Sequence, residues 1–275
     1  MTDQLKKAPS AISYFADNPI STASEDLLQR SKFVERIVRE IDMIDASQGY
    51  VMAVMGQWGS GKTSVLNLVK ERLSNSGTIL VEYNPWLLSG VEELVDGLFR
   101  EINAKLNKKG VKYRAAIDRI IDYGEMLTPL TSVPVVGAWA NGVLMPFQVM
   151  AKHRNLRTTS VVEQKEQVAE ALANIDSSIV VIVDDIDRLD KVEVREIFKL
   201  VRLTANFPNV IYLLSFDRIR VENALTEDGV PGRAYLEKIV QNGLELPMIP
   251  RKVLTREVAQ ALDSALEQVN VRLDR

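Results

Sequence analysis

The segment Gly56-Gln57-Trp58-Gly59-Ser60-Gly61-Lys62-Thr63 decides the fold of this chain. It fits the pattern G-x-x-x-x-G-K-[ST] in full, with an apolar run before it and an amphipathic helical pattern after it. Glycine lets a backbone turn tightly enough for consecutive N–H groups to face one anion. The start of the following helix adds the positive end of its dipole. We therefore expect a phosphate-binding loop between a strand and a helix.

The residue types in this loop assign roles to its side chains. Lys62 is expected to reach the β- and γ-phosphates of ATP and to be catalytic, and the Thr63 hydroxyl to bind Mg²⁺. The whole loop is the expected nucleotide-binding segment, and its members are Gly56, Gln57, Trp58, Gly59, Ser60, Gly61, Lys62, Thr63 and Ser64. For Trp58, contact with the nucleotide and packing against the domain remain two open interpretations.

Apolar runs alternate with helical patterns along most of the chain and predict a mainly parallel sheet covered on both faces. The predicted strands are 50–55, 78–83, 179–183, 210–214 and 244–246. The predicted helices are 31–46, 62–74, 91–106, 112–124, 161–173 and 191–205, and Ser160 with Glu163 forms a capping box for the fifth of them. The expected fold class is α/β, a three-layer P-loop NTPase sandwich with a five-stranded sheet.

The order of these patterns predicts one nucleotide-binding domain with additions. We expect an N-terminal arm over residues 1–30 and the P-loop NTPase domain over 31–250. A helical and apolar insert is expected at about 107–158, between the phosphate loop and the strand at 179–183. Residues 251–275 predict a C-terminal helical segment, either a small cap or a truncated element.

Two adjacent acids, Asp184 and Asp185, follow the predicted strand 179–183, at the edge of a parallel sheet where ligands bind. In a protein with a phosphate loop, we expect Asp184 to hold Mg²⁺ and Asp185 to polarise the water that attacks the γ-phosphate. The competing interpretation is a turn rich in aspartate, in which Asp187 and Asp190 cap the next helix. For Asp190 the capping role is favoured.

Further candidates follow the next predicted strand. Ser215 is a candidate catalytic residue that senses the γ-phosphate, and its alternative is an ordinary cap at a strand end. Three arginines are candidates for neutralising charge in the transition state, and a surface ion pair is the favoured interpretation of each. They are Arg188, Arg218 and Arg233.

The composition argues against several other kinds of site. The chain has no cysteine and a single histidine, His153, which leaves no thiolate zinc site and argues against a Ser-His-Asp hydrolase. A net charge of −3 argues against binding dominated by nucleic-acid phosphates. The first ten residues have no apolar core of the secretory type, so we expect a cytoplasmic protein.

Five segments together resemble successive motifs of the KAP family of P-loop NTPases. They are the loop 56–64, Tyr83-Asn84-Pro85-Trp86, Asp184-Asp185-Ile186-Asp187-Arg188-Leu189, Ser215-Phe216-Asp217-Arg218 and Tyr235-Leu236-Glu237-Lys238-Ile239-Val240-Gln241. Asp17-Asn18-Pro19-Ile20 and Asp26-Leu27-Leu28-Gln29-Arg30 resemble the family's opening element, with Gln29 where glycine is usual. The resemblance spans about residues 15–250. It implies an ATPase with an additional strand between the P-loop and acidic strands, in a family with many membrane-associated bacterial members and some that act in phage exclusion.

Residues 126–151 of the insert contain no charged residue, and a basic cluster follows them. Because a membrane span needs about 20 apolar residues, two spans do not fit. A single span would separate Lys62 from Asp184. Three interpretations stay open: peripheral contact with the inner face of the membrane, aided by the basic cluster, a surface for self-association or a protein partner, and plain packing on the domain.

The function expected from these motifs is Mg²⁺-dependent binding and hydrolysis of ATP, coupled to a conformational change, with membrane-associated phage defence as its setting. The alternative is a nucleotide-gated switch or scaffold with slow turnover. A P-loop kinase fits less well, because no acceptor-specific motif is recognised. The absence of the guanine-reading motif N-K-x-D favours ATP over GTP.

Overall fold

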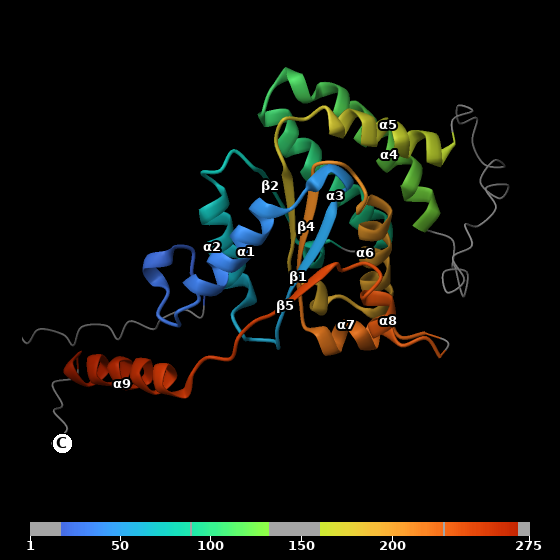
Figure 1. The fold of residues 1–275 in the computed structure, drawn as a ribbon. Coiled ribbons are helices and arrows are strands. Elements are labelled where there is room, and N and C mark those ends of the chain that lie inside the picture. Colours follow the sequence, from blue (N-terminus) through green and yellow to red (C-terminus); the bar gives the residue numbers. More distant parts are fainter. Residues whose placement is uncertain (1–17, 89, 132–159, 228, 269–275) are drawn as a thin grey trace, which may run out of the picture.

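A central five-stranded sheet organises the computed structural model, which describes residues 18–131 and 160–268 apart from 89 and 228. The strand order is β2-β3-β4-β1-β5, and every neighbouring pair is parallel. The strands are β1 (Tyr50–Met55), β2 (Ile79–Tyr83), β3 (Ile179–Val183), β4 (Val210–Phe216) and β5 (Asn242–Glu245). The predicted α/β class is confirmed, and β4 lies between the P-loop strand β1 and the acidic strand β3 (Figure 1).

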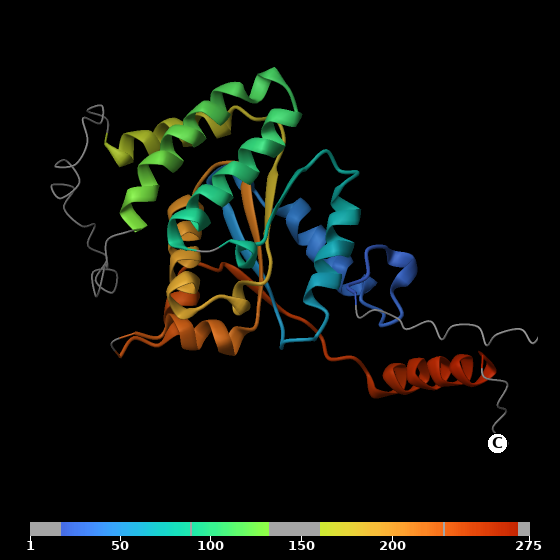
Figure 2. The same ribbon diagram turned by 180° about the vertical axis from the view of Figure 1, so that it is seen from behind.

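Helices cover both faces of this sheet (Figures 1 and 2). They are α1 (Ser31–Met43), α2 (Lys62–Leu73), α3 (Val91–Lys108), α4 (Arg114–Thr131), α5 (Val161–Ala173), α6 (Lys191–Thr204), α7 (Arg218–Leu225), α8 (Gly232–Leu236) and α9 (Arg251–Gln268). Helices α1 and α2 pack on one face, and α3 and α6 on the other. Helix α4 packs on α3, and α5 on α4.

The inner strands β3 and β4 are buried on both faces, which explains their almost entirely apolar sequences. In β3, Ile182 packs with the core on the α1–α2 side, whereas Val183 packs with the core on the α3–α6 side. Since successive side chains of a strand point to opposite faces, Asp184, the first residue after β3, is directed to the side of α2, where it meets Thr63.

Several element boundaries differ from the sequence prediction. Strand β4 continues to Phe216, so Ser215 lies inside the strand rather than after it, in register with Val54 of β1. A polar residue ends an apolar run in the sequence, yet this serine is fully buried. Helix α1 ends at Met43 instead of continuing to 46, because Asp45 caps a short 3₁₀ turn at Ala46–Gln48.

Part of the predicted insert belongs to the packed body of the domain. Helix α4 is longer than the predicted 112–124, and its buried side chains join the core on the α3 side. They are Ala116, Ile120, Tyr123 and Leu127. Residues 132–159, which include the basic cluster and most of the uncharged segment 126–151, lie outside the described residues. In the described part of the chain, the helices lack the combination of length and apolar character that crossing a membrane needs.

Candidate functional site

The loop between β1 and α2 has the backbone that the motif predicts. Gly59 and Gly61 adopt φ values of 75° and 91°, a region that L side chains rarely enter. An added Cβ at either position would meet no heavy atom within 4 Å, so the requirement for glycine there is conformational. At Gly56 it is steric, because a Cβ would lie 2.7 Å from Ser60 Oγ. Helix α2 begins at Lys62, directly after the loop.

Lys62 is folded back onto its own loop. Its Nζ donates hydrogen bonds to the main-chain oxygens of Gly56 at 3.0 Å and Gln57 at 3.3 Å. The same atom lies 3.6 Å from Asp187 Oδ2, and the two side chains are only 9% and 3% exposed. Asp187 is therefore the buried counter-charge of the phosphate-loop lysine.

Asp187 was not among the predicted site residues. The competing interpretation, in which it caps the next helix, is wrong, because the cap of α6 is Asp190, which accepts hydrogen bonds from Val192 N–H and Glu193 N–H. Asp187 instead lies in a 3₁₀ turn, Ile186–Arg188, that turns its side chain inward. The spacing D-D-x-D in the sequence is the feature that could have indicated this role. A single turn after the first acid can bring the third acid back to the side of the sheet on which the first one lies.

The predicted metal-binding pair is in contact. Thr63 Oγ1, in the first turn of α2, donates a hydrogen bond of 2.8 Å to Asp184 Oδ2 after β3. Hydroxyl and carboxylate oxygens suit Mg²⁺, which usually completes its shell with waters and substrate phosphates. The described residues contain no cluster of three or more acidic, His or Cys side chains that could hold a metal alone. Thr63 and Asp184 therefore fit an ion that is shared with a nucleotide.

Asp185 does not bond to Thr63 in this way and is held by two other side chains. Its backbone has a φ of 60°, unusual for aspartate, and its N–H donates to Asp184 Oδ1 at 2.9 Å. Asn84 Nδ2 donates to Asp185 Oδ2 at 2.9 Å, and Arg188 Nε lies 2.8 Å from Asp185 Oδ1. The Arg188 guanidinium in turn lies 4.9 Å from the centroid of the Trp86 ring. The N-P-W and D-D-x-D-R segments thus form one cluster.

The environment of Asp185 disfavours its charged form. Burial raises the pKa of this carboxyl above its usual value, and the neighbouring Asp184 and Asp187 act in the same direction. The hydrogen bond from Asn84 and the charge of Arg188 lower the pKa and oppose that shift. A carboxyl with a perturbed pKa beside a phosphate loop is a candidate acid–base group.

The three arginine candidates all have carboxylate partners within the chain, as the favoured interpretation of them predicts. Besides Arg188, Arg218 lies 2.7 Å from Glu222 and 3.3 Å from Glu245, and Arg233 lies 2.8 Å from Glu237. Of the three, only Arg188 contacts a predicted catalytic residue. We therefore assign neither Arg218 nor Arg233 a role in neutralising charge in the transition state.

Two serines at the site carry buried hydroxyls that have no hydrogen-bond partner among the described residues. They are Ser60 in the loop and Ser215 in β4. Ser215 alternates in phase with Ile211 and Leu213, so it lies on the α2 side of the sheet. An unsatisfied buried hydroxyl costs about 1–3 kcal/mol, which is consistent with a polar ligand at this site. Trp58 is 71% exposed, so it does not pack on the domain.

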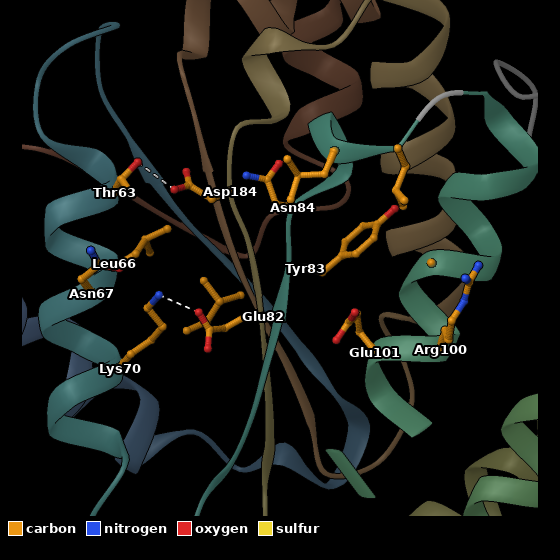
Figure 3. A pocket seen from close by; sticks show the side chains of 14 residues that line it. Thr63, Leu66, Asn67, Lys70, Glu82, Tyr83, Asn84, Arg100, Glu101 and Asp184 are labelled. Atoms are coloured by element: carbon orange, nitrogen blue, oxygen red, sulfur yellow. Dashed lines mark hydrogen bonds and ion pairs between the residues drawn. The ribbon is translucent and has the colours of Figure 1, made fainter. Parts of the chain in front are cut away.

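A cavity of about 420 Å³ opens beside the metal-binding pair, on the side of the edge strand β2 (Figure 3). Thr63 and Asp184 lie at one end of it, and the ion pair between Lys70 and Glu82 lies farther along (Figure 3). Helices α2 and α3 form its walls, and Asn84, which holds Asp185, also lines it.

The chain is similar to a known protein in sequence and to several solved structures in fold. The chain is similar to the phage T7 exclusion protein of Escherichia coli K12, with 29% identity over 285 aligned residues that include 92% of this chain. The chain spans 38% of the length of that relative. Among solved structures it is similar to the ORC2 protein of Aeropyrum pernix (12% identity, TM-score 0.44, 89% of this chain and 55% of that one). It is also similar to Cdc6p from Pyrobaculum aerophilum (14% identity, TM-score 0.47, 88% and 50%).

The family comparison covers most of the chain. Residues 30–274 match the KAP family P-loop domain. That match includes the phosphate loop, the N-P-W segment, the acidic strand end and Ser215. All four lie toward the carboxyl ends of the parallel strands. The chain therefore belongs to the KAP family of P-loop NTPases.

Proposed function

We propose that this domain binds Mg-ATP and hydrolyses it to ADP and phosphate, and that the cycle drives a conformational change. The observation that carries the proposal is the hydrogen bond between Thr63 Oγ1 and Asp184 Oδ2, with Asp185 next in the chain. It joins the phosphate loop to the acidic strand end at one point. Membership in a P-loop family supports nucleotide as the ligand.

In the proposed reaction, Lys62 leaves the carbonyl oxygens of Gly56 and Gln57 and binds the β- and γ-phosphates. Thr63 and Asp184 would hold Mg²⁺, which when bound would neutralise charge on the phosphate oxygens. Asp185 orients a water molecule and takes its proton as the water oxygen bonds to the γ-phosphorus. The bond from that phosphorus to the β–γ bridging oxygen breaks, and ADP leaves with the electron pair.

Phosphate release by the purified chain tests this proposal. With ATP and Mg²⁺ we expect multiple turnovers, which EDTA abolishes. Nucleotide binding without phosphate release would instead favour the slow switch or scaffold. Comparing ATP with GTP in the same assay determines the base preference.

One observation favours a slow or gated cycle, since both oxygens of Asp185 are engaged by Asn84 and Arg188. Asn84→Ala frees one of them, so we expect turnover to rise by about threefold to tenfold, the size of one typical net hydrogen bond. Nucleotide affinity should stay unchanged. Steady-state phosphate release measures the effect, with Asn67→Ala as control, because Asn67 lines the same cavity but donates to Ile20. A fall in turnover would mean that Asn84 holds Asp185 in its productive position.

Asp187 is expected to restrain Lys62. Asp187→Asn removes the counter-charge that lies 3.6 Å from Lys62 Nζ. Less free energy is then needed to move the lysine from its present partners to the phosphates. We expect nucleotide affinity to increase by about threefold to tenfold, a small part of the interaction in this buried ion pair. Calorimetric titration with Mg-ADP measures it. Asp190→Asn is the control, because asparagine caps a helix about as well as aspartate, so neither the cap of α6 nor the affinity should change. A large turnover defect in Asp187→Asn would make Asp187 the general base.

The cavity beside the metal-binding pair favours a second candidate function, transfer of the γ-phosphate to an acceptor other than water. Its end at Thr63 and Asp184 is where an acceptor would approach the phosphate. Product analysis with γ-labelled ATP distinguishes the two functions. Label in free phosphate alone supports hydrolysis, and label in any other product supports transfer.

We propose phage defence as the biological setting, supported by the similarity to a phage T7 exclusion protein. Association with the inner face of the membrane is a further proposal for the insert at 126–151. Phage plating on cells that express the protein, with Lys62→Ala as the inactive control, tests the first. Flotation with anionic vesicles tests the second.

A further inference from the structure

Arg30 is a buried cation that contacts the outer side of the phosphate loop. The residue is 6% exposed, and its Nη2 donates a hydrogen bond of 3.1 Å to the main-chain oxygen of Ser60. Its Nη1 donates to the main-chain oxygen of Pro247, just after β5. In the described part of the chain, the guanidinium bonds to these carbonyls and forms no ion pair. Burial lowers the pKa of Arg30, and the charge of Asp26 opposes this.

The backbone around Arg30 is held in one unusual conformation. Gln29 adopts a φ of 57°, in the left-handed region that favours glycine and costs a larger residue strain. Asp26 Oδ1 accepts the N–H of Arg30 at 2.9 Å, and Asp26 Oδ2 accepts the N–H of Ser31 at 2.8 Å. These bonds fix the start of α1, so the direction of the Arg30 side chain is set before it reaches the loop.

The contact with Ser60 orients a peptide group of the loop. In a planar trans peptide, the C=O of one residue and the N–H of the next point in opposite directions. Arg30 draws the Ser60 oxygen outward, and the N–H of Gly61 is therefore turned toward the inner side of the loop. Inward N–H groups are what a phosphate loop supplies to its anion. A buried positive charge behind the loop adds attraction for the same anion.

The contact with Pro247 links the loop to the C-terminal part of the domain. Leu246 N–H donates to the Met55 oxygen at 2.7 Å, so residues 246 and 247 lie against the end of β1. The chain then runs through 248–250 into α9, which extends away from the sheet (Figure 1). One guanidinium thus bonds both the phosphate loop and the segment that leads to this helix.

We propose that Arg30 is a positioning residue that holds the phosphate loop ready for nucleotide and passes its occupancy to the segment 246–250. The proposal rests on the nucleotide binding proposed above. When phosphate binds the Gly61 N–H, it holds the adjoining Ser60 oxygen in place, and this strengthens the existing bonds that join the Ser60 oxygen, Arg30 and the Pro247 oxygen. The segment before α9 then becomes less mobile.

Arg30→Met and Arg30→Lys test whether Arg30 holds the phosphate loop ready for nucleotide. Arg36→Met is a matched control on α1, because Arg36 is exposed and paired with Glu40. Affinity for Mg-ADP is measured by calorimetry, well below the melting temperature of each variant without nucleotide. We expect Arg30→Met to weaken binding by about tenfold or more, the effect of one lost hydrogen bond from a charged group. Arg30→Lys should recover part of it, because an ammonium keeps the charge without the two-armed fork, and Arg36→Met should match wild type.

A purely structural role predicts a different result, in which Arg30→Met lowers the melting temperature but leaves the affinity of the folded protein within twofold of wild type. That result would overturn the proposal. If wild type itself binds no nucleotide, the proposed function fails and not only this inference. If wild type and Arg30→Met bind equally well, only the inference fails.

Amide hydrogen exchange in the full chain tests whether nucleotide occupancy is passed to the segment 246–250. The probes are the N–H groups of Leu246, Met248 and Ile249, since both prolines of this segment have none. We expect Mg-ADP to slow their exchange in wild type and in Arg36→Met, and to leave it unchanged in Arg30→Met even at saturating nucleotide. Equal slowing in Arg30→Met, or no slowing in wild type, would refute the link to 246–250.

Discussion

Lys62→Ala is expected to abolish tight binding of Mg-ATP. Lys62 is the side-chain cation at the start of α2, and loss of its charge-assisted bonds to phosphate should weaken binding by roughly 10²–10³-fold. Calorimetric titration measures the loss. Arg72→Ala, an exposed position on the same helix, should bind as wild type. Near-native affinity in Lys62→Ala would contradict the assignment of the phosphate loop.

Loss of folding would also abolish binding, and a double variant distinguishes the two causes. Removing Lys62 leaves Asp187 buried without its counter-charge, a change that costs about 3–5 kcal/mol in a well-buried pair. The double variant with Lys62→Ala and Asp187→Asn removes both charges. We expect it to regain most of the stability and none of the nucleotide affinity. Recovery of both would show that the single variant failed through folding.

Asp185→Asn is expected to reduce turnover by roughly 10²–10⁴-fold, the range for loss of a general base. Binding of Mg-ATP should remain close to wild type, because the amide keeps the shape of the side chain and does not touch the metal-binding pair. Asp184→Asn should instead weaken Mg²⁺-dependent binding, since it removes charge from the metal ligands. Phosphate release and calorimetry, with and without Mg²⁺, separate the two effects.

The different partners of the two acids make this prediction specific. Asp184 accepts the bond from Thr63, whereas Asp185 is bonded by Asn84 and Arg188. Equal and small losses in both variants would contradict the division of roles. A variant of Asp190, the helix cap, should retain both binding and turnover.

Local features of this protein were predictable from its sequence. The glycines of the loop, the start of α2 at Lys62 and the cap of α6 at Asp190 depend on neighbours within a few residues. Strand β3 was predictable too, because an uninterrupted β-branched run fits a strand buried on both faces. The extent of β4 was not, since Ser215 is polar in sequence and its place inside the strand depends on pairing with Val54 of β1.

The contacts that define the site were decided by the tertiary structure. Lys62 with Asp187, Asn84 with Asp185 and Arg30 with Ser60 join residues that are far apart or belong to different elements. Spacing along the chain fixes the face on which a side chain lies, but not the side chain that it meets across a sheet. That partner depends on strand order and on the turn after each strand. The sequence by itself therefore determined which chemistry gathers at the ends of the strands, and only packing decided which groups hold one another there.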